Sequence, residues 1–267
     1  MMPSPDTTLI RELLGPDGPH FELLAEVDST NSWLLDAPFA GTPASPRAVL
    51  AQTQRAGRGR RGRSWLAEPG RSLALSLAFE RAGAAPPAPG LSLAVGCAIA
   101  AALSEDCQGL ALKWPNDLLR DGGKCGGILI ESRPGGARLE PRVRVVVGVG
   151  LNLLAPQDAQ ALIGQPASGL FDGAAPIRVE ALVSRVVLAV AKAWTTHERE
   201  GLAPFLPLWA RFDAWHGEQV TVSEAGQTLA RGRSLGIAPS GALRLLTDEG
   251  ERHIVAGDLS LRAARQA

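Results

Sequence analysis

The spacing of apolar residues along the chain changes after Gly217, and this change limits the folds that the sequence can adopt. Before Gly217, strand-like apolar runs alternate with helical patterns, and the longest pattern spaces apolar residues at i, i+3, i+4 and i+7 from Val179 to Trp194. After Gly217, short apolar runs are separated by Gly, Ser and Asp-Glu-Gly turns, as in small all-β units. The sequence therefore predicts a large domain of mixed helices and strands, residues 1–216, followed by a small β domain, residues 217–267.

The same patterns predict the individual elements. Helices are expected at Thr7–Leu14, through Trp33–Leu35 with a cap at Ser29, Thr30 or Asn31, and at Leu91–Glu105, Val179–Trp194 and Pro204–Trp215. Strands are expected at His20–Val27, Ala48–Ala51, Leu73–Phe79, Leu110–Lys113, Gly127–Glu131, Arg142–Gly148, Gln219–Val222, Thr228–Gly232, Ala242–Thr247 and His253–Val255. Residues 154–176 are expected to form a long loop.

Charge and cysteine usage exclude several classes of protein. Lys+Arg and Asp+Glu both total 27, which disfavours a protein that holds nucleic acid over its whole surface. No apolar stretch reaches the roughly 18 residues of a membrane span, and the N-terminus shows no secretory signal. The three cysteines lack CxxC spacing, and the four histidines show no metal-ligand spacing. We expect a cytoplasmic protein without membrane contact.

The densest positive charge lies in the segment Gln54–Arg63, here called the Arg/Gly loop. Its Gly57-x-Gly59-x-x-Gly62 spacing matches the dinucleotide fingerprint, but the next strand starts near Ser72 and leaves no room for the crossover helix of that motif. Two interpretations stay open for the loop. It could be a solvated basic loop, or its guanidinium groups could converge on a phosphate or carboxylate, which we favour because crowded like charges repel one another.

Three further segments combine turn residues with polar groups: Lys113–Asp117 after a strand, Gly122–Gly127 before one, and Gly148–Asn152 at the end of a buried one. Each segment alone is compatible with an ordinary turn. Among the basic residues only Lys113, Lys124 and Lys192 are lysine, and all the others are arginine. Because arginine is the usual cation of this chain, a lysine in two of these segments favours a functional role for its ammonium group. Lys124 stands among four glycines, which would allow the backbone to approach a ligand closely.

Together these segments resemble the bacterial biotin–protein ligases. The motifs are, in chain order, DSTN, QRAGRGRRGRSW, KWPNDLL, GGKCGGILIES and VGVGLNL. The likeness runs from about residue 22 through EREGLAPFLPLWARFDAW to GDLSLR near the C-terminus. It implies an α+β fold like that of class II aminoacyl-tRNA synthetases, with a mixed sheet, and an SH3-like C-terminal β-barrel. It also implies the reaction: biotin and ATP give biotinyl-AMP and pyrophosphate, and a lysine of an acceptor domain then takes the biotin.

The resemblance also implies site residues. The expected biotin site is Ser29, Thr30, Asn31, Gln54, Arg58, Gly59, Arg60 and Lys124. The expected ATP site is Arg60, Arg61, Lys113, Asn116, Asp117, Lys124 and Asn152, with Asn152 reading adenine. Lys124 and Arg60 are the expected catalytic residues, and Asp117 the expected ligand of Mg²⁺.

The expected partner is a biotin carboxyl carrier protein or another biotin-accepting domain, and a homodimer is a further expectation. Only about 20 residues precede the catalytic motifs, too few for the helix-turn-helix domain of the repressor type, so no DNA binding is expected. Two alternatives stay open. A lipoate or octanoate ligase of the same superfamily would have less use for polar residues around a ureido ring, and an RNA-binding module would need more stacking aromatic surface.

Overall fold

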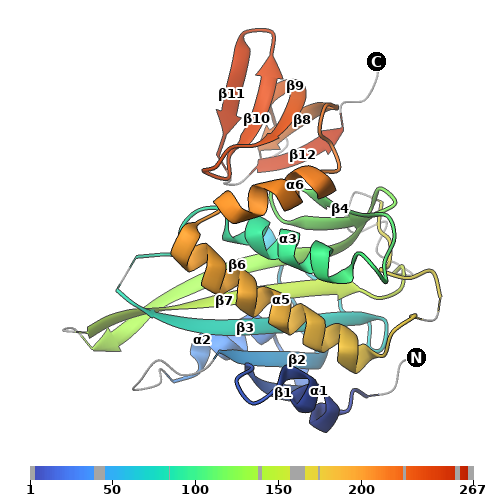
Figure 1. Cartoon of the computed structure of the whole chain (residues 1–267), viewed down its shortest axis with the longest axis vertical. Helices are drawn as coiled ribbons and strands as arrows, with labels where there is room; N and C mark the ends of the chain where they lie inside the picture. The colour runs from blue at the N-terminus through green and yellow to red at the C-terminus, as the bar shows by residue number, and fades with distance from the viewer. Residues whose placement is uncertain are drawn as a thin grey trace.

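A mixed seven-stranded sheet forms the centre of the computed structural model, which describes residues 4–38, 46–83, 85–137, 140–156, 166–173, 175–224, 227–255 and 259–263 (Figure 1). Its strand order is β1-β2-β3-β7-β6-β5-β4. Only β1 and β2 pair in parallel, and all other neighbours are antiparallel. The strands are β1 (His20–Val27), β2 (Arg47–Gln54), β3 (Ser72–Ala82), β4 (Leu110–Lys113), β5 (Asp117–Arg120), β6 (Gly123–Ala137) and β7 (Glu140–Asn152).

Strand β3 shows how the two faces of this sheet differ. Its large residues, such as Leu75 and Leu77, join the main hydrophobic core, whereas Ser76 and its small neighbours point to the opposite face. Ser76 pairs with Gly148 of β7, so small residues lie side by side on that face. The alternation in the sequence thus builds one face for packing and leaves room on the other.

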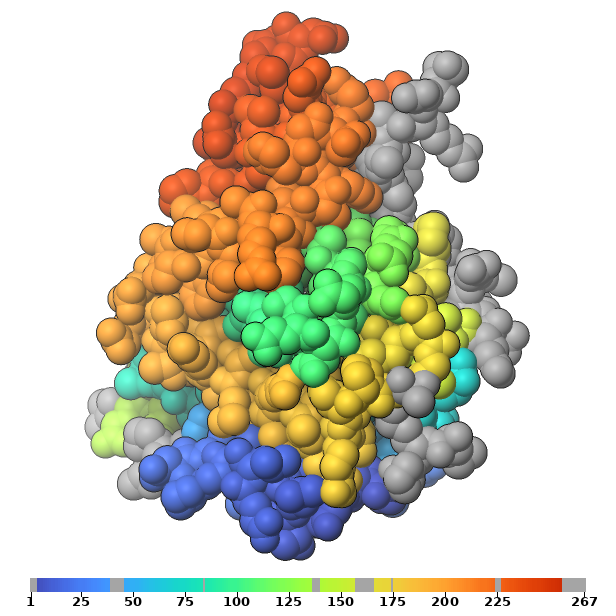
Figure 2. All heavy atoms as spheres, turned by 45° about the vertical axis from the view of Figure 1, so that its right-hand side comes forward, coloured from blue at the N-terminus to red at the C-terminus, as the bar shows by residue number. Residues whose placement is uncertain are grey.

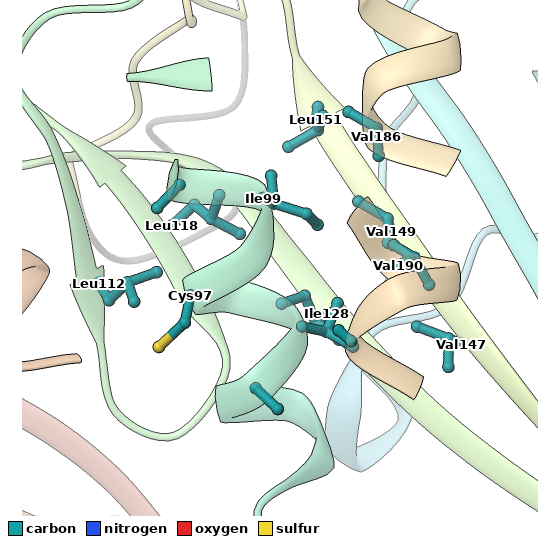
Figure 3. Packing of buried hydrophobic residues seen from close by; sticks show 14 of the residues in the cluster. Cys97, Ile99, Leu112, Leu118, Ile128, Val147, Val149, Leu151, Val186 and Val190 are labelled. Atoms are coloured by element: carbon teal, nitrogen blue, oxygen red, sulfur yellow. The ribbon is translucent and has the colours of Figure 1, made fainter. Parts of the chain in front are cut away.

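Helices cover both faces. Residues of α3 and α5 pack on the core face, where Ile99, Val186 and Val190 meet Val149 and Ile128 of the sheet (Figure 3). Helix α2 covers part of the opposite face through Leu34 and Leu35. The described helices are α1 (Thr7–Leu14), α2 (Thr30–Asp36), η1 (Arg60–Gly62), α3 (Leu91–Leu103), α5 (Val179–Glu200), η2 (Ala203–Phe205) and α6 (Leu206–Phe212).

The C-terminal segments form a second sheet of five antiparallel strands, which stands as a lobe at one end of the molecule (Figures 1 and 2). Its order is β11-β10-β9-β8-β12, and its strands are β8 (Gln219–Glu224), β9 (Gln227–Ile237), β10 (Leu243–Thr247), β11 (Gly250–Ile254) and β12 (Leu259–Ala263). The lobe rests on the turn between β4 and β5. There the buried Trp114 indole N–H donates to the Gly241 carbonyl at 3.1 Å.

The predicted fold class is confirmed, and the differences lie in single elements. Strand β6 is much longer than the expected Gly127–Glu131 and takes in the glycines around Lys124. The segment Asp117–Arg120 forms a strand that the sequence did not predict, because it begins inside a run of turn residues. The strand β12 was also missed. The expected helix Pro204–Trp215 is shorter, since Asp213 is extended and its carboxylate accepts from the Trp209 indole and the Trp215 backbone N–H.

Residues 157–165 and 174 of the expected long loop lie outside the described part of the chain. Among the residues that are described, no helix is long and apolar enough to cross a membrane.

A buried histidine on α5 gives the fold a dependence on pH. His197 is 1 % exposed, its Nε2 lies 3.1 Å from the Pro89 carbonyl oxygen, and its buried Nδ1 has no hydrogen-bond partner. Burial lowers the pKa of His197 below its ordinary value. The native protein therefore binds fewer protons here than the unfolded chain does once the pH falls below about 6.5.

We predict that the free energy of unfolding decreases from pH 7.5 to pH 5.5, and that His197→Gln makes this decrease smaller. Denaturant titrations of both proteins at each pH measure the difference, in which groups shared by the two proteins cancel. An equally steep decrease in the variant would show that another group carries the dependence.

Candidate active site

A cavity of about 470 Å³ opens on the α2 face of the seven-stranded sheet. It lies between the start of α2, the Arg/Gly loop, the β4–β5 turn and the ends of β5, β6 and β7. The structure brings every predicted site residue to this one cavity: Ser29, Thr30, Asn31, Gln54, Arg58, Gly59, Arg60, Arg61, Lys113, Asn116, Asp117, Lys124 and Asn152.

Hydrogen bonds arrange one end of the cavity around the first turn of α2. Ser29 is the N-cap of this helix, and its hydroxyl accepts from the Ser32 N–H. The Gln54 side-chain oxygen accepts from both the backbone N–H of Thr30, at 2.8 Å, and its hydroxyl, at 3.0 Å. The loop and the helix start are therefore held against each other by one amide oxygen.

Asn31 is held just as firmly on the sheet side. The Ser76 hydroxyl donates to Asn31 Oδ1 at 2.6 Å, and Asn31 Nδ2 donates to Glu131 Oε2 at 2.8 Å. Glu131 also pairs with Arg58 at 2.9 Å. Ser76 and Glu131 were not predicted from the sequence; the only available signal for Ser76 was a polar residue within an otherwise apolar strand.

The glycines of the motif Gly148-Val149-Gly150 make room for two side chains. A Cβ on Gly148 would lie 2.3 Å from Asn31 Oδ1, and a Cβ on Gly150 would lie 2.4 Å from the Trp65 ring. Both distances are shorter than any real contact, so each glycine is required by the side chain across from it. The sequence predicts a role only for Asn152 of this motif and none for Trp65.

The Arg/Gly loop contains no long helix, in agreement with the rejection of a dinucleotide fingerprint. It turns through η1 with Arg61 at φ 62° and Gly62 at φ 69°. The Arg60 guanidinium donates to Asn116 Oδ1 at 3.1 Å, and Asn116 Nδ2 donates in turn to the Ile128 carbonyl at 2.9 Å. The loop is thus connected to the β4–β5 turn across the cavity.

Two lysines and one buried carboxylate form the opposite end. Asp117 Oδ1 lies 2.7 Å from Lys124 Nζ, and Oδ2 lies 3.0 Å from Lys113 Nζ. Burial alone would raise the pKa of the Asp117 carboxyl, but the Lys124 and Lys113 ammonium groups outweigh it and hold the pKa below its ordinary value. Lys113 also lies over the Trp215 ring, 5.6 Å from its centroid. The formal charges of Asp117, Lys113 and Lys124 therefore sum to one positive charge, and the three side chains are largely buried.

This arrangement does not fit the predicted role of Asp117 as a direct magnesium ligand. Both of its oxygens already accept from ammonium groups, and a divalent cation would meet two positive charges there. Within the described ranges, no group of three or more His, Cys, Asp or Glu side chains could hold a metal ion. Asp117 is therefore not assigned a metal in the reaction described below.

A short segment after residue 165 borders the cavity near Lys124 and Asn152. The Lys124 N–H donates to the Pro166 carbonyl at 2.8 Å, and Asn152 Nδ2 donates to the Ser168 carbonyl at 3.4 Å. The neighbouring Cys125 is fully buried, and burial raises the pKa of its thiol. This cysteine is therefore a packing residue and not an activated nucleophile.

Comparisons with known proteins give the family and the relatives of this chain. Residues 23–152 match the Biotin/lipoate A/B protein ligase family, and residues 216–262 match the Biotin protein ligase C terminal domain. The chain is 32% identical to the bifunctional ligase/repressor BirA of Escherichia coli K12, over 96% of this chain and 78% of that protein. It is 34% identical to the biotin–[acetyl-CoA-carboxylase] ligase of Paracoccus denitrificans, over 89% of this chain and 98% of that protein.

A solved structure shows the same fold. The chain is similar to the biotin protein ligase from Aquifex aeolicus in complex with biotin and ATP, with a TM-score of 0.73 and 26% identity, over 92% of this chain and 99% of that one.

Proposed function

The chain belongs to the biotin protein ligase family, and on this basis we propose how the residues of its cavity carry out the ligase reaction. It is a biotin–[acetyl-CoA-carboxylase] ligase that uses biotin and ATP. The biotin carboxylate attacks the α-phosphorus of ATP, the bond to the β-phosphate oxygen breaks, and pyrophosphate leaves. The amine of an acceptor lysine then attacks the biotinyl carbonyl, and AMP leaves.

The observation that carries our assignment of the two substrates is the division of the cavity into unlike ends. Around Thr30 and Gln54 lie neutral hydrogen-bonding groups, which suit a ureido ring. Around Arg60, Lys113 and Lys124 lie cations, which suit a carboxylate and phosphates. An aliphatic acid such as octanoate would leave the first set of polar groups without partners.

We propose that the second end works by positioning and by charge. Lys124 and Arg60 lie where the carboxylate of biotin and the α-phosphate meet, while Arg61, Lys113, Asn116 and Asn152 receive the rest of ATP. As the carboxylate attacks, negative charge moves toward the phosphate oxygens, and fixed cations stabilise it without reorganising. No protein nucleophile is needed, because biotin supplies the attacking oxygen.

Magnesium is proposed only as the ion that accompanies the phosphates of ATP, with few or no direct protein ligands. The acceptor is proposed to be a lysine of a biotin carboxyl carrier domain. A homodimer stays a prediction.

The experiment that tests the proposed function is pyrophosphate exchange into ATP, with biotin, lipoate and octanoate offered separately to the purified protein. Exchange that depends on biotin alone supports the proposal. Exchange driven by lipoate or octanoate and not by biotin would replace it with the sister activity.

A further prediction concerns the neutral end of the cavity. Gln54→Ala is expected to weaken the binding of biotin by about tenfold, since a lost partner leaves buried polar groups at a cost of roughly 1–3 kcal/mol. The affinity for ATP should stay nearly unchanged. Calorimetric titrations with each substrate measure the two values, and an equal loss for both would indicate a general loosening of the loop.

A further inference from the structure

A carboxylate just outside the cavity holds two of the residues that line it. Glu131 lies on β6, opposite Val146 of β7, and its side chain is 25% exposed. Its Oε2 accepts from Asn31 Nδ2 at 2.8 Å and from Arg58 Nη2 at 2.9 Å. The same guanidinium nitrogen also lies 2.9 Å from Oε1. Glu131 therefore joins the first turn of α2 to the Arg/Gly loop.

The two hydrogen-bond partners of Glu131 restrict which side chain can take its place. Both partners of Glu131 are donors only at the atoms they present, one an amide NH₂ and one a guanidinium. A carboxylate offers acceptors at both oxygens, whereas glutamine of the same shape would turn an NH₂ group toward one of the two donors. Arg58 would also lose the negative charge beside it.

The Asn31 amide has no freedom to adapt to such a change. Its oxygen already accepts from the Ser76 hydroxyl, and the amide lies close against Gly148. A shift of Asn31 would therefore be passed to Thr30, whose hydroxyl also lies 2.7 Å from Ser76 Oγ and bonds to Gln54.

We propose that Glu131 is a positioning residue for the biotin site. It acts through Asn31 and Arg58, holds the helix start and the loop at one separation, and thereby sets the affinity for biotin without touching it. This inference rests on the proposed assignment of that end of the cavity to biotin. It assigns no role to Glu131 at the cationic end, where Lys113, Asp117 and Lys124 lie.

The test is the variant Glu131→Gln, assayed for pyrophosphate exchange with biotin and ATP varied in turn. We expect the KM for biotin to rise about tenfold, the scale for a polar group that loses its partner, and the KM for ATP to change less than about twofold. Glu131→Asp keeps the charge and should retain more biotin affinity than the glutamine variant. In an Arg58→Ala background, Glu131→Gln should cost about threefold or less, because one of its two partners is already gone.

The matched control is Glu198→Gln. Glu198 accepts from Arg81 at 3.1 Å and is 24% exposed, much like Glu131, but it lies on α5 and its partner Arg81 does not line the cavity. It should leave both KM values unchanged.

Two results would overturn the inference: a KM for biotin within twofold of the unmodified protein, or equal losses for biotin and ATP. If Glu131→Gln unfolds at the assay temperature, the same comparison is made with Glu131→Asp, and equal losses there count equally against it. Absence of biotin-dependent exchange in the unmodified protein would instead refute the proposed function, so the two failures are distinguishable.

Discussion

Replacement of Lys124 by arginine is expected to lower the rate of biotin-dependent pyrophosphate exchange by about 100-fold or more, the scale for losing one oriented transition-state donor. Arginine keeps the positive charge, so charge alone cannot cause the loss. The ammonium of Lys124 is a compact donor that lies 2.7 Å from Asp117 and is seated against Gly127. A planar, longer guanidinium cannot occupy the same space, and its donors point elsewhere.

The control for this variant is Lys192→Arg, on the exposed side of α5, which should leave the exchange rate unchanged. Circular dichroism of both variants should match that of the unmodified protein. Near-normal exchange by folded Lys124→Arg would show that the lysine is an ordinary turn residue and would remove it from the catalytic assignment.

Asp117→Asn is expected to have the largest effect on stability, a loss of about 3–5 kcal/mol in the free energy of unfolding, as when one partner is removed from a buried ion pair. The carboxylate stands between two ammonium groups, and Lys113 is only 5% exposed. An amide would leave two neighbouring positive charges without their shared anion. The lowered pKa of Asp117 reflects the same balance, since both lysines favour its charged form.

Denaturant titration near pH 7 measures this loss, and Asp172→Asn is the control. Asp172 pairs with Arg120, but its side chain is 87% exposed, so solvent screens that ion pair and its removal should cost far less than the removal of the Asp117 carboxylate. A similar small cost for Asp117→Asn would mean that solvent screens the two lysines, and the description of this end as enclosed would be wrong.

The sequence predicted the class of fold and most of its elements because the signals were strong and local. The period of α5 and the alternation along β3 each follow from one stretch of chain. Many of the residues that line the cavity were also predicted, because five motifs together resembled one family. Their common location could not be derived from spacing alone, since Gln54 and Lys124 are distant in the chain and meet only through the order of the sheet.

The residues that were missed act through contacts between distant segments. Glu131 closes an apolar run and looks like any strand end, yet its partners are about 70 and 100 residues away. Gly148 is required by Asn31, and nothing in the local sequence states that requirement. The surroundings of Asp117 were missed for the same reason: the sequence shows its carboxylate, but only the fold shows the two lysines that contact it.

The contact between Trp114 and Gly241 has a consequence for how this protein can evolve. The turn that presents Lys113 and Asp117 to the cavity is also the surface on which the C-terminal sheet rests, and Trp215 lies directly over Lys113. Selection for the reaction therefore extends to residues of the small sheet that touch no substrate. A recombination event that exchanged this sheet for an unrelated one would have to reproduce the carbonyl group that accepts from Trp114.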